Sequence, residues 1–256
     1  MNGTVGSRKR WKLKRILLSS VVIVILLIGA SWISYRWLVY SPAERAAASM
    51  ISDMNVRVNE AGDSFVFEPT GTVRSLSVIF YPGALVAPES YSPWARELAA
   101  NGFRVYMVRM PFDLAVLGSN KADAIIAAHP NEAFVIGGHS LGGALAARYA
   151  ASRADKLKGI FFMAAYADAK GSLAGTSLKA LQMTGSKDGI LNWQTWEAGK
   201  SLMPKDTTYV SIEGGNHGQF GSYGYQRGDN QARISEEEQH KQMTQALIAW
   251  LEGISS

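Results

Sequence analysis

Residues 133–153 read AFVIGGHSLGGALAARYAASR, and this stretch decides the fold. Its first part is a short apolar run typical of a buried strand, and its last part is rich in small residues with a helical pattern. Between the two lies Gly138-His139-Ser140-Leu141-Gly142, a G-x-S-x-G pattern at a strand-to-helix turn. A sharp turn of this kind exposes the serine hydroxyl, and its glycines avoid collisions with the neighbouring strand and helix. The pattern predicts that Ser140 is a nucleophile.

On both sides of this stretch, short β-rich runs alternate with helix-patterned segments. The runs that read as strands are 64–68, 75–81, 103–109, 133–137, 159–164, 179–184 and 207–212. The helical patterns cover 90–101, 119–128, 141–153, 192–201 and 235–252, and 41–61 reads as a short helix leading into a further strand. Such alternation is typical of a mostly parallel, doubly wound sheet covered by helices on both faces. We therefore predict an α/β fold.

A serine nucleophile needs a general base, and the base needs an acid that fixes its tautomer. His217 follows the strand at 207–212 in the Gly-rich sequence EGGNHG, and we predict that it is the base. Asp188 follows the strand at 179–184 in GSKDG, and it is the predicted acid. Asp168 follows the preceding strand, where such a sheet can also supply an acid, and it remains the alternative.

Acyl transfer passes through a tetrahedral anion that two N–H donors must stabilise. The backbone N–H of Leu141, directly after Ser140, is the first predicted donor. The second is expected in the loop Tyr81-Pro82-Gly83-Ala84-Leu85, where Gly83 permits a turn that presents the N–H of Ala84. Leu85 is the alternative donor, and a plain Pro-Gly turn is the alternative interpretation of the loop.

The amino-terminal region carries a run of about 20 uncharged residues, 16–35, and a helix of that length spans the roughly 30 Å core of a bilayer. Six Lys and Arg residues precede the run, whereas only Arg36 and Arg45 follow it closely. The positive-inside rule therefore places the amino terminus in the cytoplasm and the rest of the chain outside it. The small residues Gly29-Ala30-Ser31 leave a cleaved signal peptide and a secreted product as the alternative.

These signals divide the chain into four segments. They are a basic cytoplasmic segment (1–15), a transmembrane signal-anchor helix (16–38) inserted in the lipid bilayer, a short linker (39–54) and a catalytic domain (55–256). Six of the 26 Lys and Arg residues lie within 1–15, so the rest of the chain is close to neutral and the charge gives no indication of a nucleic-acid partner. The absence of Cys excludes thiolate chemistry, and the four His have no metal-ligand spacing, so we expect neither a metal nor another cofactor.

Five segments together resemble the α/β-hydrolase fold-5 family of small bacterial hydrolases. They read IFYPGALVAPESY, MVRMPFDLAVL, VIGGHSLGG, GSKDG and EGGNHGQFGSYG, and the resemblance spans about residues 55–253. It implies an eight-stranded sheet and a Ser-Asp-His triad, which falls on Ser140, Asp188 and His217. It implies no settled substrate, although many members are bacterial and carry an amino-terminal anchor.

About 24 residues separate the strand at 159–164 from Asp188, which leaves no room there for a large cap domain. We therefore expect an open site with apolar neighbours, suited to an ester or thioester with a small to medium acyl group. The alternative is a binding or receptor protein that keeps the hydrolase fold but turns over slowly or not at all. The tripeptide Arg227-Gly228-Asp229 resembles an integrin ligand, but it belongs to the family-like loop after His217.

Overall fold

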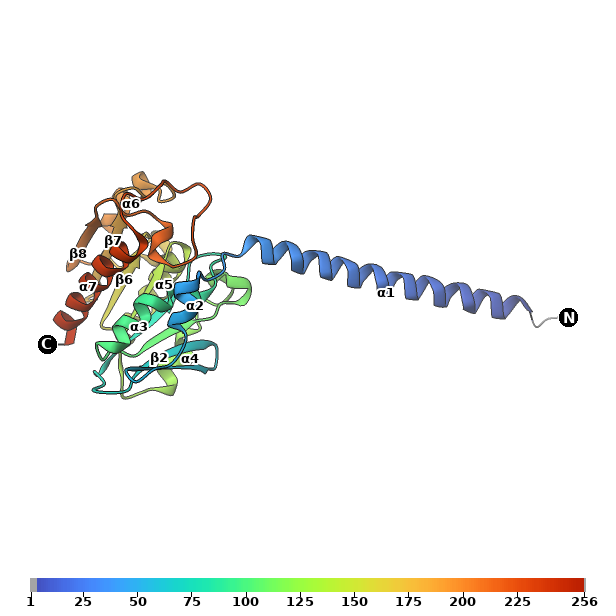
Figure 1. Cartoon of the computed structure of the whole chain (residues 1–256), viewed down its shortest axis with the longest axis horizontal. Coiled ribbons are helices and arrows are strands. Elements are labelled where there is room, and N and C mark those ends of the chain that lie inside the picture. Colours follow the sequence, from blue (N-terminus) through green and yellow to red (C-terminus); the bar gives the residue numbers. More distant parts are fainter. Residues whose placement is uncertain (1–3, 256) are drawn as a thin grey trace. The chain divides into compact units, whose positions relative to one another are not determined.

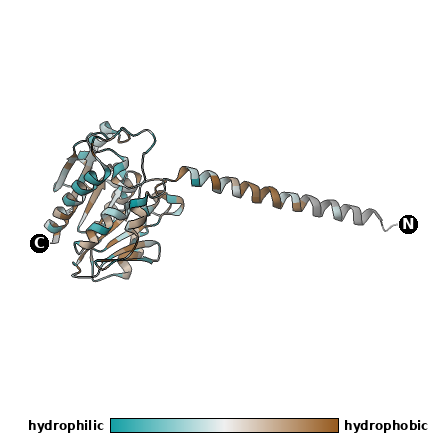
Figure 2. Ribbon diagram, in the orientation of Figure 1, coloured by the Kyte–Doolittle hydropathy of each residue, from teal (hydrophilic) through white to brown (hydrophobic). Residues whose placement is uncertain are grey.

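A computed structural model describes residues 4–255, which form two compact units that meet between Val39 and Tyr40. The first unit is the single helix α1 (Thr4–Leu38). Its segment Leu17–Leu38 is the one described helix long and apolar enough to cross a membrane, and Figure 2 shows the hydrophobic colouring in the middle of α1. The predicted basic segment 1–15 starts outside the described residues.

The second unit is built on one eight-stranded sheet (Figure 1), with the strand order β1-β2-β4-β3-β5-β6-β7-β8. The strands are β1 (Val56–Ala61), β2 (Ser64–Pro69), β3 (Leu76–Tyr81), β4 (Val105–Val108), β5 (Ala133–His139), β6 (Gly159–Met163), β7 (Lys179–Gly185) and β8 (Thr207–Ile212). Strand β2 runs antiparallel to both of its neighbours, and all other pairs are parallel. The predicted α/β class, the mostly parallel sheet and the eight strands are confirmed.

Helices cover both faces of the sheet because successive strand residues point to opposite sides. In β3, Val78 and Phe80 face the core shared with α3 (Ser92–Ala100) and α7 (Glu236–Ser255). Ile79 and Tyr81 face the core shared with α5 (Leu141–Ser152) and α4 (Ala122–Ala128). A further helix, α6 (Trp193–Gly199), follows β7.

The segment predicted as a linker, 39–54, is largely folded onto the second unit. Tyr40 forms an isolated parallel bridge with Val86, and the helix α2 (Glu44–Ser49) packs on α3. Ala46 of α2 is fully buried, and its carbonyl oxygen accepts a hydrogen bond of 2.6 Å from the Ser92 hydroxyl. The sequence showed the helix but not its packing, because a six-residue helix has too little pattern to indicate a buried face.

Candidate active site

The turn between β5 and α5 holds Ser140 in a strained backbone conformation. Its φ is +52°, a region that L-residues other than Gly seldom occupy. The turn is tight enough that a Cβ on Gly138 would lie 2.5 Å from the backbone of Gly142, and one on Gly142 would lie 2.2 Å from the carbonyl oxygens of Tyr81 and Pro82. The glycines at both positions are therefore required by close backbone approach, as the sequence pattern predicts.

Positive φ values of non-glycine residues are confined, within the described part of the chain, to loops that follow the carboxyl ends of parallel strands. Leu85 follows β3, Phe112 and Asp113 follow β4, Ser140 follows β5 and Ala164 follows β6. Each such conformation costs on the order of 1–3 kcal/mol, so the surrounding structure must hold it in place. Strain of this kind is concentrated where binding and catalysis require fixed geometry, which marks this edge of the sheet as the candidate site.

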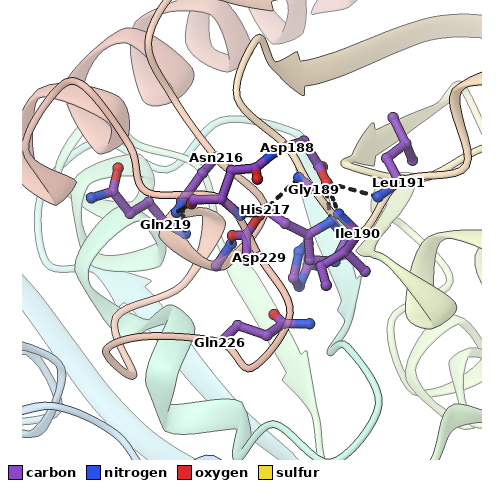
Figure 3. A network of polar contacts seen from close by, with 12 residues as sticks. Asp188, Gly189, Ile190, Leu191, Asn216, His217, Gln219, Gln226 and Asp229 are labelled. Atoms are coloured by element: carbon purple, nitrogen blue, oxygen red, sulfur yellow. Dashed lines mark hydrogen bonds and ion pairs between the residues drawn. The ribbon is translucent and has the colours of Figure 1, made fainter.

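The structure pairs His217 with Asp188 (Figure 3). Nδ1 of His217 donates a 2.8 Å hydrogen bond to Oδ2 of Asp188, and both side chains are buried. The other carboxylate oxygen of Asp188 accepts from the N–H groups of Ile190 and Leu191, at 2.8 and 2.7 Å. Three donors therefore fix this carboxylate, and Nε2 of His217 has no partner among the described residues.

Asp168, the alternative acid, lies in a different environment. Its carboxylate forms an ion pair with Arg148 of α5, with Nε of Arg148 at 3.0 Å from Oδ2, and it accepts from the N–H of Gly171 at 2.9 Å. The guanidinium of Arg148 holds the pKa of Asp168 below its ordinary value. The geometry brings Asp188, and not Asp168, into contact with His217.

The loop after β3 presents three consecutive N–H groups, of which two are already bonded. The N–H of Gly83 donates to the Tyr91 hydroxyl at 3.0 Å, and that of Leu85 donates to the carbonyl of Asp113 at 2.8 Å. The N–H of Ala84 has no acceptor within residues 4–255. Between the two donors weighed from the sequence, Ala84 is therefore the one left available to a ligand.

Tyr91 and His139 support this loop, and neither role was visible in the sequence. The Tyr91 hydroxyl accepts from the N–H of Gly83 and shares a hydrogen bond of 2.9 Å with Nδ1 of His139. Burial, and then the neighbouring His217, hold the pKa of His139 well below its ordinary value, so its ring is neutral and Nδ1 can accept. The centroid of the His139 ring also lies 4.6 Å from that of the His217 ring.

Ser140 and His217 line the same pocket, whose volume is about 260 Å³. Most of its wall is apolar and comes from the start of α5 and from the loops after β6 and β7, as Leu141, Ala144, Ala164, Ala165, Tyr166, Ile190, Leu191 and Asn192. The apolar neighbours expected from the sequence are therefore present. The pocket is thus a small apolar recess beside a serine hydroxyl and an imidazole.

Asp229 ties together the loops that carry Asp188 and His217 (Figure 3). Its Oδ1 accepts from the N–H of Gly189 at 2.9 Å, and its Oδ2 accepts from the N–H of Gly218 at 2.8 Å. The side chain is buried, so the tripeptide 227–229 has a structural carboxylate where an integrin ligand needs an exposed one. The sequence offers no signal for this contact, because Asp229 is 40 residues from Gly189.

We expect Asp229→Ala to lower kcat by about 10²-fold while KM changes little, because the N–H groups of Gly189 and Gly218 would lose their acceptor and the acid and base would lose their alignment. Asp229→Asn keeps one acceptor oxygen and should recover part of the rate. The exposed carboxylate of Asp206 provides the matched control, since Asp206→Ala makes the same change far from these loops. Equal kcat in the two alanine variants would contradict this positioning role.

The comparisons with known proteins agree with this geometry. A family model described as the Alpha/beta hydrolase family matches residues 77–241, which is more than half of the 256-residue chain. The matched region runs from β3 to α7 and includes every candidate site residue named above. No curated protein matches the sequence.

Solved structures share the fold at low sequence identity. A predicted CIB-like hydrolase from Thermoplasma acidophilum has a TM-score of 0.54 at 18% identity, covering 75% of this chain and 96% of its own. An esterase from Thermogutta terrifontis has a TM-score of 0.54 at 15% identity, covering 81% and 92%. A metagenome-derived lipolytic enzyme has a TM-score of 0.56 at 15% identity, covering 73% and 97%. At these identities the likeness concerns the fold alone.

Proposed function

Because this chain belongs to the alpha/beta hydrolase family, we propose that it is a serine hydrolase that cleaves ester bonds through an acyl-enzyme. The observation that carries the proposal is the pocket shared by Ser140 and His217, with Asp188 hydrogen-bonded to the far side of the His217 ring. A packing requirement alone would not put a serine, an imidazole and a carboxylate at three strand ends in this arrangement.

In this mechanism, Oγ of Ser140 attacks the ester carbonyl carbon, and its proton passes to Nε2 of His217. The buried carboxylate of Asp188 stabilises the imidazolium that forms. The N–H groups of Ala84 and Leu141 stabilise the tetrahedral anion. Its collapse breaks the carbon–oxygen bond to the alcohol, which leaves with the proton from His217. Water then attacks the acyl-enzyme by the same steps and releases the acid.

The pocket indicates the class of acyl group. Its volume of about 260 Å³ is below the range of roughly 300–1,000 Å³ that holds drug-sized ligands, and its wall has no side chain that carries a permanent charge. A small to medium uncharged acyl group of an ester or thioester fits this recess. The structural neighbours described as an esterase and a lipolytic enzyme support ester substrates.

The test is a series of chromogenic p-nitrophenyl esters given to the full chain in detergent, from acetate through butyrate and octanoate to palmitate. We expect kcat/KM for butyrate to exceed that for palmitate by at least about tenfold, because a sixteen-carbon acyl chain does not fit a recess of about 260 Å³. Labelling of the protein by a fluorophosphonate without turnover of any ester would instead support a binding or receptor protein on a hydrolase fold.

We also propose that α1 anchors the chain in the cell membrane as a single-pass helix, with residues 1–15 cytoplasmic, 16–38 in the bilayer and the catalytic domain extracytoplasmic. The segment Leu17–Leu38 is 22 residues long and carries no charged side chain except Arg36, which supports this arrangement. The protein should then stay with membranes through a carbonate wash. A mature form that begins near residue 32 would show a cleaved signal peptide instead.

A further inference from the structure

Exposed apolar side chains gather in segments that follow the carboxyl ends of the strands, at the edge of the sheet that also carries the candidate site, and we call them the site rim. It consists of Phe112, Val116, Leu117, Ile190, Trp193 and Tyr225, which are 65, 56, 55, 37, 40 and 70% exposed. They lie in the segments that follow β4, β7 and β8. Single exposed apolar residues are ordinary, but six at one edge of the sheet, three of them aromatic, indicate contact with an apolar partner.

Hydrogen bonds show that the site rim is joined to the point where the chain enters the domain. The N–H of Tyr40 donates to the carbonyl of Leu85 at 2.8 Å, and the N–H of Leu85 donates to the carbonyl of Asp113, next to Phe112. On the other side, the Tyr40 hydroxyl accepts from the N–H of Arg227 at 3.1 Å, two residues beyond Tyr225. Tyr40 is thus fixed between two segments of the rim.

Contacts between neighbouring loops connect the rest of the rim. A Cβ on Gly228 would lie 3.5 Å from Cδ1 of Ile190, so the loop after His217 contacts the loop after β7. The indole Nε1–H of Trp193 donates to the carbonyl of Asp188 at 3.1 Å. The rim therefore passes from Phe112 by way of Tyr225 to the loop of the candidate acid.

The covalent link to the apolar helix limits how far this edge can lie from a membrane. The apolar segment ends at Leu38, and only Val39 separates it from Tyr40. Two residue steps span at most about 7 Å, whatever the direction of the helix. If α1 crosses a bilayer, the rim segments bonded to Tyr40 must lie at the bilayer surface.

We propose that the site rim docks on the lipid surface and that the substrate is an ester held in the bilayer, whose short acyl group enters the pocket from the membrane side. This inference rests on the proposed hydrolase function and on the membrane anchor. Aromatic and aliphatic rim side chains enter the interfacial layer, where amphipathic rings are most favourable. The long apolar alcohol part of the substrate stays in the lipid while Ser140 attacks the carbonyl at the surface.

The activity test compares two butyrate esters that form the same acyl-enzyme. The full chain is reconstituted in phosphatidylcholine vesicles and given either hexadecyl butyrate within the bilayer or p-nitrophenyl butyrate in the water. Phe112→Asp and Tyr225→Asp should lower hydrolysis of the bilayer ester by about tenfold and leave the soluble ester within twofold, because a charge opposes insertion of the rim. Asp also tolerates the positive φ of residue 112.

The matched control is Val73→Asp, at an exposed apolar residue that precedes β3 and therefore lies at the opposite edge of the sheet. It should leave both rates unchanged. Equal losses on the two esters, or no loss on either, in the rim variants would overturn the docking. Failure of the wild-type chain to hydrolyse p-nitrophenyl butyrate would instead overturn the proposed function.

A second readout does not depend on activity. The natural chain has no Cys, so Phe112→Cys, Tyr225→Cys and Val73→Cys each provide one site for a polarity-sensitive fluorophore. In vesicles that contain lipids with brominated acyl chains, we expect labels at 112 and 225 to be quenched and the label at 73 to stay bright. Equal quenching at 73 and 112 would overturn the proposal.

Discussion

Ser140→Ala is expected to abolish fluorophosphonate labelling and to lower ester hydrolysis by about 10⁴-fold or more, because the hydroxyl is the proposed covalent centre. The substitution should have little effect on folding. Alanine is as disfavoured at a φ of +52° as serine is, and Ser140 lines the pocket rather than the core. Labelling and the rate of p-nitrophenyl butyrate hydrolysis by the purified full chain measure the effect.

Ser152→Ala provides the matched control, because it removes the same hydroxyl from the last residue of α5, the helix that Ser140 precedes. That variant should keep wild-type labelling and rate. Retained labelling of Ser140→Ala would show that another residue is the nucleophile.

Asp188→Asn should lower kcat by about 10⁴-fold and leave KM nearly unchanged. The Asn amide can keep an acceptor oxygen, but it cannot stabilise a positive imidazolium, and it favours the wrong tautomer of His217. The two N–H groups of Ile190 and Leu191 would still find an acceptor, so the loop should fold. Steady-state kinetics with the best p-nitrophenyl ester separate the effects on kcat and KM.

Asp168→Asn is the companion variant, because it makes the same chemical change at the other aspartate that follows a strand. It should cost at most about 1 kcal/mol of stability, since the partly exposed ion pair with Arg148 would be weakened. Its kcat should remain close to the wild-type value. If Asp168→Asn is inactive and Asp188→Asn is active, Asp168 is the acid. The assignments of Ser140 as nucleophile and His217 as base would remain.

The fold could be predicted from the sequence because the elements that define it are local. The run 133–153 contains a strand, a turn and a helix that follow one another directly along the chain. Each of them has its own residue pattern. The strand ends of a parallel sheet lie at one edge, so the order of Ser140, Asp188 and His217 suggested that they meet. The choice between Asp188 and Asp168 could not be made this way, because both follow strands that end at that edge.

The residues that the sequence did not reveal act through distant contacts. Tyr91 reaches Gly83 and His139 across 8 and 48 positions, and no spacing rule connects an aromatic hydroxyl with such partners. The pocket wall at 164–166 depends on the positive φ of Ala164. The residue type alanine gives no indication of that conformation in the sequence. In both cases the tertiary structure decides the local conformation, whereas the sequence pattern reports only periodicity and turns.

Asp229 also has a consequence for local unfolding. Because one carboxylate accepts from Gly189 and from Gly218, neither loop can detach without exposing the same buried charge. The two loops should open as a single cooperative unit, and hydrogen exchange should give their amides a common free energy of opening. We therefore expect no long-lived state in which Asp188 is in place and His217 is not. The two side chains should be either aligned or, for a short time, both displaced.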